Sequence, residues 1–123
     1  YQVAAANKGI VVGTGNKVED FGVGFYTKYG DGGVDISPIA DCNKTEVWEL
    51  GKELGILKEI IDAPPTDGLW DDGRTDEGQL GLSYKELEEA MDNENSVNRD
   101  KYNSIRSANL HKMEPIPVCK IPN

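Results

Sequence analysis

The chain has 123 residues, which allows one domain at most. Hydrophobic residues make up 37% of it, a low share that limits the size of any core. The net charge of -9, from 22 acidic and 13 basic side chains, argues against a nucleic-acid backbone as partner.

The first expected elements are a short helix and a buried strand. Residues 1–7 indicate a helix that stops near Gly9. Residues 10–12 form a β-branched run, Ile-Val-Val, typical of a parallel strand covered on both faces. The turn at residues 13–16 follows, at the strand end where ligands collect in open α/β sheets. Because a lone parallel strand cannot satisfy its backbone hydrogen bonds, we expect the other strands to lie outside this sequence.

The next expected element is a helix that begins at Asn43. Asn43 and Glu46 form an N-x-x-E variant of the capping box, and Gly55 supplies a C-terminal stop. Apolar residues recur between them at helical spacing. A further apolar turn at residues 56–61 precedes a Pro-Pro pair, which ends this helical region.

A second capping signature lies in the last third of the chain. Ser83 and Glu86 predict a helix that continues through Met91. Residues 93–103 are polar and poor in apolar side chains, so we interpret them as mobile or as a linker. The tail at residues 109–122 carries three prolines and is expected to be extended. One buried strand and three or four short helices amount to half of an α/β fold.

Several polar side chains are candidates for a ligand site, and each has a purely structural alternative. Thr14 lies in the turn after the strand, where its hydroxyl could reach a nucleotide or simply form the turn. Glu19 and Asp20 could bind Mg²⁺, which favours one or two carboxylates plus phosphate oxygens, or they could form a solvated acidic turn. Lys44 stands at a helix start, where the helix dipole disfavours a cation unless an anion is bound nearby.

A glycine-containing segment at residues 30–35 joins flexible backbone to charges of both signs. Lys28 precedes this segment and Asp35 closes it, which is the chemistry of a loop around a polar ligand. Thr66 follows the two prolines, in either a rigid ligand loop or a connector. His111 and Lys112 stand in the tail, where surface exposure is the ordinary explanation.

The cysteines and the hydropathy exclude other classes of protein. Cys42 and Cys119 lie far apart, and His111 is the only histidine. No C-x-x-C pair is present, so we predict neither a zinc site nor a disulfide framework, and the pattern suits a reducing cytoplasm. No apolar run approaches the roughly 20 residues of a membrane span, so no membrane partner is expected.

Three stretches together resemble the carboxy-terminal half of the ammonia-dependent NAD⁺ synthetases. They are residues 11–47, 64–91 and 111–118, so the match covers nearly the whole chain. The block T-K-Y-G-D-G-G-V-D at residues 27–35, with a lysine nine residues after its last aspartate, is highly specific. So is D-E-G-Q-L-G-L-S-Y at residues 76–84, ahead of an acidic helix.

This resemblance implies a partial segment of a doubly wound, parallel α/β fold of the ATP-pyrophosphatase (adenine nucleotide alpha hydrolase-like) type. Residues 1–123 would be the carboxy-terminal part of one synthetase domain in a cytoplasmic homodimer. The implied enzyme is a ligase that forms a carbon–nitrogen bond in the last step of NAD⁺ biosynthesis. Mg-ATP adenylates the carboxylate of nicotinic acid adenine dinucleotide, and ammonia then displaces AMP. ATP is needed because a carboxylate is a poor acyl electrophile, and cations beside the phosphates supply catalysis.

The resemblance divides the candidate residues between the two substrates and assigns no catalytic residue. The positions that fall on ATP-binding residues are Thr14, Lys44 and Thr66, and Glu19 falls on a Mg²⁺ ligand. The positions that fall on residues binding the dinucleotide are Lys28, Asp35, His111 and Lys112.

Three features depart from the family pattern. The Ser-Gly-Gly-x-Asp-Ser pyrophosphate loop is absent from this sequence, as is the substrate-binding arginine expected shortly before Tyr1. One extra residue separates Glu19 from the block at residues 27–35, so Asp20 could share the metal role. The usual P-T/S-A-D-L loop has its aspartate moved by one place, to Asp67.

Two alternatives stay open at this point. The parent could be a glutamine-hydrolysing NAD⁺ synthetase, which an amidase domain would reveal. The chain could also be an inert fragment that only binds nucleotide or mediates dimerisation. Because it begins with Tyr1, with no signal-peptide pattern after it, we expect an excerpt from a longer protein, inactive alone for want of the pyrophosphate loop.

Overall fold

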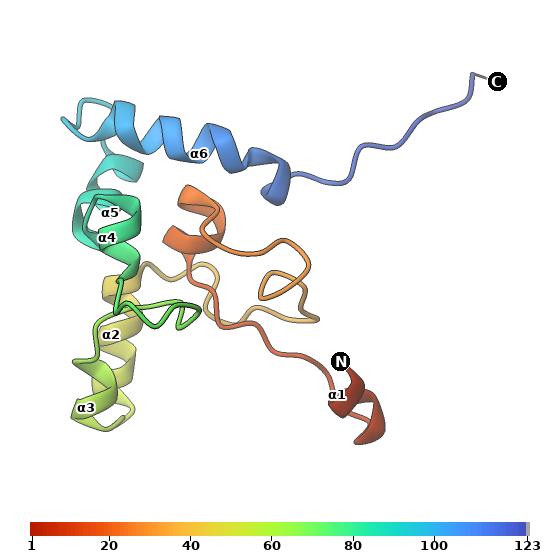
Figure 1. Cartoon of the computed structure of the whole chain (residues 1–123), viewed down its shortest axis with the longest axis horizontal. Helices are drawn as coiled ribbons and strands as arrows, with labels where there is room; N and C mark the ends of the chain where they lie inside the picture. Colours follow the sequence, from red (N-terminus) through yellow and green to blue (C-terminus); the bar gives the residue numbers. More distant parts are fainter. Residues whose placement is uncertain (123) are drawn as a thin grey trace.

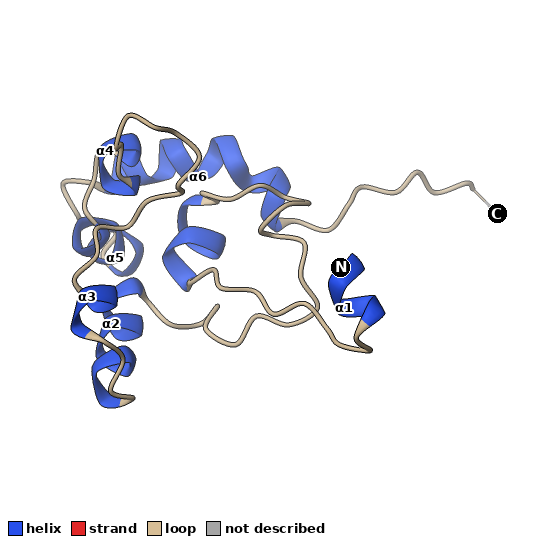
Figure 2. Cartoon of the chain, turned by 60° about the horizontal axis from the view of Figure 1, so that its bottom comes forward, coloured by secondary structure: helices blue, strands red, loops and turns tan. Residues whose placement is uncertain are grey.

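The structure is a computed structural model, and it describes residues 1–122. In this part of the chain all regular elements are helices, connected by long loops (Figures 1 and 2). The elements in chain order are α1 (Gln2–Ala6), the π-helix η1 (Val18–Val23), α2 (Lys44–Glu53), α3 (Lys58–Ile61), α4 (Asp76–Leu80), α5 (Tyr84–Asp92) and α6 (Arg99–Met113).

Both predicted capping boxes are confirmed. In α2 the Asn43 side chain accepts from the third helical N–H, while Glu46 accepts from the Asn43 backbone at 2.7 Å. In α5 the Ser83 side chain accepts from the Glu86 N–H, and the Glu86 carboxylate accepts from the Ser83 N–H at 2.8 Å. Each box satisfies N–H groups that the first turn of a helix leaves unpaired, so both helices begin where the local sequence indicates.

The predicted strand is present only as a trace. Val12 forms an isolated parallel bridge with Ile36, and residues 1–122 contain no longer strand. Asp35 supports this bridge twice, because its backbone N–H donates to the Val11 carbonyl and its carboxylate accepts from the Val11 N–H at 2.7 Å. Val12 and Ile36 are nevertheless exposed. The predicted cover on both faces of this strand is therefore not provided by residues 1–122.

The core is small and lies where α5 and α6 pack against η1. Its buried apolar residues are Val18, Val23, Leu80, Leu82, Tyr84, Leu87, Ala90 and Tyr102. Figure 1 shows α6 lying across α5 and η1, with α1 set apart and the C-terminal tail extending away. The accessible surface is 8875 Å² for 13.5 kDa, against roughly 6500 Å² for a compact monomer of this mass. The excess surface agrees with the expectation of half a fold.

The interpretation of residues 93–103 as a linker was wrong. A turn occupies residues 94–95, and α6 begins at Arg99. Arg99 donates to the carbonyls of Ala90, at 2.5 Å, and Met91, at 3.1 Å, which ties the start of α6 to the end of α5. The prediction of an extended tail at residues 109–122 holds only for residues 115–122, which contain no helix or strand. Residues 109–113, with His111 and Lys112, form the last turn of α6 instead. No helix within residues 1–122 is long and apolar enough to cross a membrane.

Candidate functional site

The π-helix η1 places an acidic pair at the centre of the molecule. Asn16, which is buried, precedes η1, and its side-chain oxygen accepts from the N–H groups of Val18, at 3.0 Å, and Glu19, at 3.1 Å. The helix ends at Gly24, whose φ of 67° lies in the left-handed region that favours glycine. π-Helices of one or two turns are uncommon and occur often at functional sites. Asn16 and Gly24 thus fix where Glu19 and Asp20 project.

Glu19 forms a largely buried ion pair with Lys44. Its Oε1 lies 3.0 Å from Lys44 Nζ, and the two side chains are only 15% and 18% exposed, respectively. The Tyr84 hydroxyl donates to the same oxygen at 2.6 Å. Burial, the largest single influence, would raise the pKa of Glu19, but the bond from Tyr84 and the charge of Lys44 together lower it. Glu19 is therefore held as an anion. Its negative charge offsets the unfavourable interaction between Lys44 and the positive end of the α2 dipole.

Asp76 lies on the other side of the Tyr84 hydroxyl. Its Oδ2 is 3.0 Å from that oxygen, the residue is 7% exposed, and its Oδ1 is buried without a hydrogen-bond partner among residues 1–122. Burial raises the pKa of Asp76. The Tyr84 hydroxyl lies within hydrogen-bonding distance of both carboxylates, 2.6 Å from Glu19 Oε1 and 3.0 Å from Asp76 Oδ2, and links the two residues.

Asp20 lies over the glycine turn that contains Thr14. A Cβ built on Gly15 would lie 2.2 Å from the Asp20 carboxylate, so only glycine leaves room for that side chain. Burial, followed by the negative charges of Glu19 and Asp31, raises the pKa of Asp20 to about 6. A cation bound beside Asp20 would stabilise its ionised form against burial and the neighbouring negative charges.

Side chains of α6 bind the backbone at the end of η1, an arrangement we call the α6 clasp. Arg106 donates to the carbonyls of Phe21 and Gly22, Asn109 donates to Val23, and Lys112 donates to Gly24 at 2.8 Å and Tyr26 at 2.7 Å. Lys28 returns a bond to the His111 carbonyl at 2.6 Å. The clasp satisfies carbonyls that a helix end leaves unpaired. It also fixes the loop that leads to residues 30–35.

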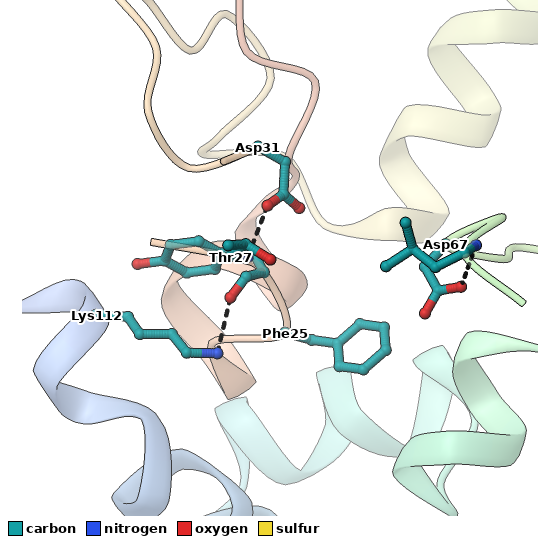
Figure 3. Close-up of a pocket in the computed structure, with 7 residues that line it drawn as sticks. Phe25, Thr27, Asp31, Asp67 and Lys112 are labelled. Carbon is teal, nitrogen blue, oxygen red and sulfur yellow. Dashed lines mark hydrogen bonds between the residues drawn. The ribbon is translucent and has the colours of Figure 1, made fainter. Parts of the chain in front are cut away.

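Two adjoining cavities open beside η1. The larger, of about 360 Å³, is lined by Thr14, Glu19, Phe25, Asp31, Lys44, Pro65, Thr66, Asp67 and Asp76. The smaller, of about 200 Å³, shares Phe25, Asp31 and Asp67 with it and adds Tyr26, Thr27, Leu69 and Lys112 (Figure 3). The two cavities are therefore neighbours: the larger is lined mainly by polar groups and the smaller mainly by apolar ones.

All four residues predicted for ATP and metal line the larger cavity, although they come from four separate segments. They are Thr14, Glu19, Lys44 and Thr66. Among the residues predicted for the dinucleotide, Lys112 lines the smaller cavity, with its amine bonded to two backbone carbonyls. Lys28, Asp35 and His111 line neither cavity, and Asp35 serves instead to support the strand bridge.

Several residues that shape this site were not predicted from the sequence. Tyr84 and Asp76 lie inside a motif of the family, but nothing in their local pattern indicates that they meet Glu19. Asn16 does have a local signal, because Asn16 and Glu19 repeat the N-x-x-E spacing of Asn43 and Glu46. Arg106 has none, because its partners are backbone carbonyls far away along the chain. Among residues 1–122, no group of three or more His, Cys, Asp or Glu side chains is arranged to hold a metal ion by itself. A cation here would therefore need ligands from a phosphate or from another segment.

Comparison with known proteins gives consistent findings. A family model described as NAD synthase matches residues 1–119. The NH₃-dependent NAD⁺ synthetase of Alkaliphilus oremlandii is 47% identical over 123 residues, which is 98% of this chain and 48% of that protein. The chain thus spans about half the length of the curated relative it matches.

Two solved structures are similar to this one. The NMN synthetase from Francisella tularensis superposes with a TM-score of 0.90 at 35% identity, over 98% of this chain and 51% of that one. The NH₃-dependent NAD synthetase from Campylobacter jejuni, in complex with the nitrate ion, gives a TM-score of 0.67 at 23% identity, over 98% of this chain and 49% of that one. The second likeness concerns the fold alone.

Proposed function

The chain belongs to the NAD synthase family, and from this premise we propose that it is the carboxy-terminal half of a cytoplasmic, ammonia-dependent NAD⁺ synthetase. The complete enzyme would convert nicotinic acid adenine dinucleotide to NAD⁺ with ATP, Mg²⁺ and ammonia, as a homodimer. An amino-terminal half would supply the pyrophosphate loop and complete a doubly wound parallel sheet of the ATP-pyrophosphatase type. We call the two halves together the complete unit.

One observation carries this proposal: the residues expected to bind ATP and metal line a single cavity. Thr14, Glu19, Lys44 and Thr66 are separated along the chain and share no local pattern, yet they border the same 360 Å³ of space. Such convergence of polar groups is typical of a ligand site. The open bridge at Val12 and the excess surface support the need for a second half.

The donor set fits a magnesium ion that is bound jointly with a nucleotide. Mg²⁺ uses one or two carboxylates together with phosphate oxygens, which agrees with Glu19 standing in a cavity that has no complete metal cage among residues 1–122. Asp20, with its raised pKa, is a second carboxylate within reach of the same turn. When bound, the ion would neutralise charge on the phosphates.

The side chains of this half would position and neutralise the phosphates of ATP. Lys44 is held in place by Glu19, so its charge is oriented before any ligand arrives. Thr14 and Thr66 contribute hydroxyl groups at the cavity wall. Attack of the substrate carboxylate on the α-phosphorus would release pyrophosphate, and attack of ammonia on the acyl carbon would release AMP. Both steps place growing negative charge on phosphate oxygens, where a fixed cation helps most.

The test is reconstitution. The 123-residue chain alone is expected to release no pyrophosphate from Mg-ATP and the acid dinucleotide, whereas the complete unit should form NAD⁺ with ammonium. Chromatography of the products would show NAD⁺ directly. Activity of the isolated chain would disprove the division of the site between two halves. A complete unit that binds ATP without forming product would favour the inert-fragment alternative, and activity only with glutamine would favour the glutamine-hydrolysing one.

A second candidate function comes from the similarity to the NMN synthetase from Francisella tularensis, with its TM-score of 0.90. A synthetase that forms NMN would amidate a mononucleotide acid in place of the dinucleotide. The competition experiment is direct: both acids are offered to the complete unit, and the ratio of kcat/KM values assigns the preferred substrate. A ratio above about tenfold toward the mononucleotide would replace the first proposal.

A further inference from the structure

The hydroxyl of Tyr84 is not required by the packing of its ring. The ring is fully buried, meets Trp48 edge to face with 6.2 Å between centroids, and lies 4.9 Å from Lys44 Nζ. A phenylalanine ring would make the same contacts. Burial of a hydroxyl is unfavourable unless it is hydrogen-bonded, so the two carboxylates that meet this one deserve a functional explanation.

The contacts of Tyr84 determine which oxygen of Glu19 is occupied. Tyr84 Oη, at 2.6 Å, and Lys44 Nζ, at 3.0 Å, both bind Oε1. Oε2 has only a 3.4 Å contact, with the backbone N–H of Asn16. One oxygen is thus held by two strong donors while the other stays almost free. A carboxylate fixed in this way presents one lone oxygen in a defined direction.

Asp76 fixes the tyrosine in turn. Its Oδ2 lies 3.0 Å from Tyr84 Oη, and the residue is more than nine-tenths buried at the wall of the larger cavity. The Thr75 side chain caps α4 by accepting from the Gly78 N–H at 3.1 Å, which sets the first turn of the helix that carries Asp76. The orientation of Glu19 therefore depends on a residue 57 positions further along the chain, through Tyr84.

We propose that Tyr84 is a positioning residue, anchored by Asp76, that orients Glu19 so that Oε2 is offered to a divalent cation. This inference rests on the proposed function, because the cation is the one expected to accompany ATP. Tyr84 does not touch the ligand itself. Partners that orient a metal ligand in this way usually change metal affinity tenfold or more when they are removed.

The test compares two buried tyrosines in the complete unit. Tyr84→Phe removes the hydroxyl and keeps the ring, while Tyr102→Phe makes the same change at a tyrosine that is 5% exposed and packs against Arg99 instead. Binding of Mn²⁺, in the presence of a non-hydrolysable ATP analogue, is measured by the loss of the free-ion signal in electron paramagnetic resonance. We expect Tyr84→Phe to weaken Mn²⁺ about tenfold and Tyr102→Phe to stay within twofold.

The outcomes separate the inference from the proposed function. Unchanged Mn²⁺ affinity in Tyr84→Phe, with only a lowered unfolding midpoint, would mean a structural role and overturn the inference. Failure of the unsubstituted protein to bind Mn²⁺ with the nucleotide would overturn the proposed function as well. Should Tyr84→Phe not fold, Asp76→Ala, which removes the hydrogen bond to Tyr84, tests the anchor: a twofold to fivefold weaker affinity is expected, and an affinity equal to that of the unsubstituted protein would reject it. The KM for Mg²⁺ should rise in both variants more than kcat falls.

Discussion

The ion pair between Lys44 and Glu19 offers a sharp test of the site in the complete unit. Lys44→Met keeps the length and the apolar stem of the side chain and removes its charge. Glu19 then stays largely buried with no cation beside it. We expect the free energy of unfolding to fall by about 2 kcal/mol, with the helix α2 still formed because its capping box does not involve Lys44.

The magnitude follows from the geometry. At 3.0 Å the attraction is roughly 5 kcal/mol for an effective dielectric constant near 20, but removing lysine also removes its desolvation penalty. Breaking a fully buried pair costs about 3–5 kcal/mol, and an exposed pair contributes below about 1 kcal/mol. With side chains 18% and 15% exposed, this pair stands between those limits, nearer the buried one.

The assay is urea denaturation followed by tryptophan fluorescence, to which Trp48, packed on Tyr84, and the exposed Trp70 both contribute. A double-mutant cycle with Glu19→Gln should give a coupling free energy of about 1.5 kcal/mol. Lys52→Met is the matched control, because Lys52 lies exposed on the same helix and has no ion pair within residues 1–122. It should change the stability by about 0.5 kcal/mol or less. A coupling near zero, or an equal effect at both lysines, would show that solvent screens the pair and would refute the reasoning.

Three further predictions concern Asp20, Gly24 and Asp35. The pKa of Asp20 is raised from 3.8 to about 6, so its favourable contribution to stability is complete below about pH 3.8 and is lost as the pH rises through 6. Asp20→Asn should therefore raise the free energy of unfolding at pH 7 by roughly 1 kcal/mol, after allowance for partial hydration, and leave it unchanged at pH 3.5. Equal effects at both pH values in urea titrations would contradict this. Gly24→Ala should lower the free energy of unfolding by at least about 1 kcal/mol more than Gly68→Ala. Both glycines have positive φ, but only at Gly24 would an added Cβ meet α6, 2.6 Å from Asn109 Cβ. Equal denaturation midpoints for the two variants would contradict this close approach. If Asp35 binds substrate, Asp35→Asn in the complete unit should weaken binding of the acid dinucleotide tenfold or more and change the KM for ATP by no more than about twofold. Equal losses for both substrates, with a lower melting temperature, would mean that Asp35 only supports the strand bridge.

The parts of the fold that the sequence predicts are those with local causes. The capping boxes at Asn43 and Ser83 link residues three positions apart, and both helices begin there. The extended tail follows from its prolines in the same way. These features depend on neighbours along the chain, so a single sequence suffices to find them.

The parts that escaped prediction have distant causes. The sequence of α6 is mostly polar, and only Tyr102 and Ile105 join it to the core, so the helix also depends on Arg99 and on the α6 clasp, whose partners are distant backbone groups. The π-helix begins with a local cause, the cap from Asn16, but its end depends on Arg106, 84 positions beyond Gly22. Individual residues of the candidate site could be predicted only through the family resemblance. The hydrogen bonds that link Asp76, Tyr84 and Glu19 became visible only in the structure.

The α6 clasp also has a consequence for the order in which the molecule is made. Its hydrogen bonds join residues 84 to 88 positions apart, so they close loops that span more than two thirds of the 123-residue chain. During synthesis, η1 leaves the ribosome long before Arg106, Asn109 and Lys112 exist to bind its carbonyls. Contacts of such separation form late and slowly. The acidic turn that carries Glu19 would therefore acquire its final shape among the last events of folding, and a nascent chain halted before α6 would expose it unformed.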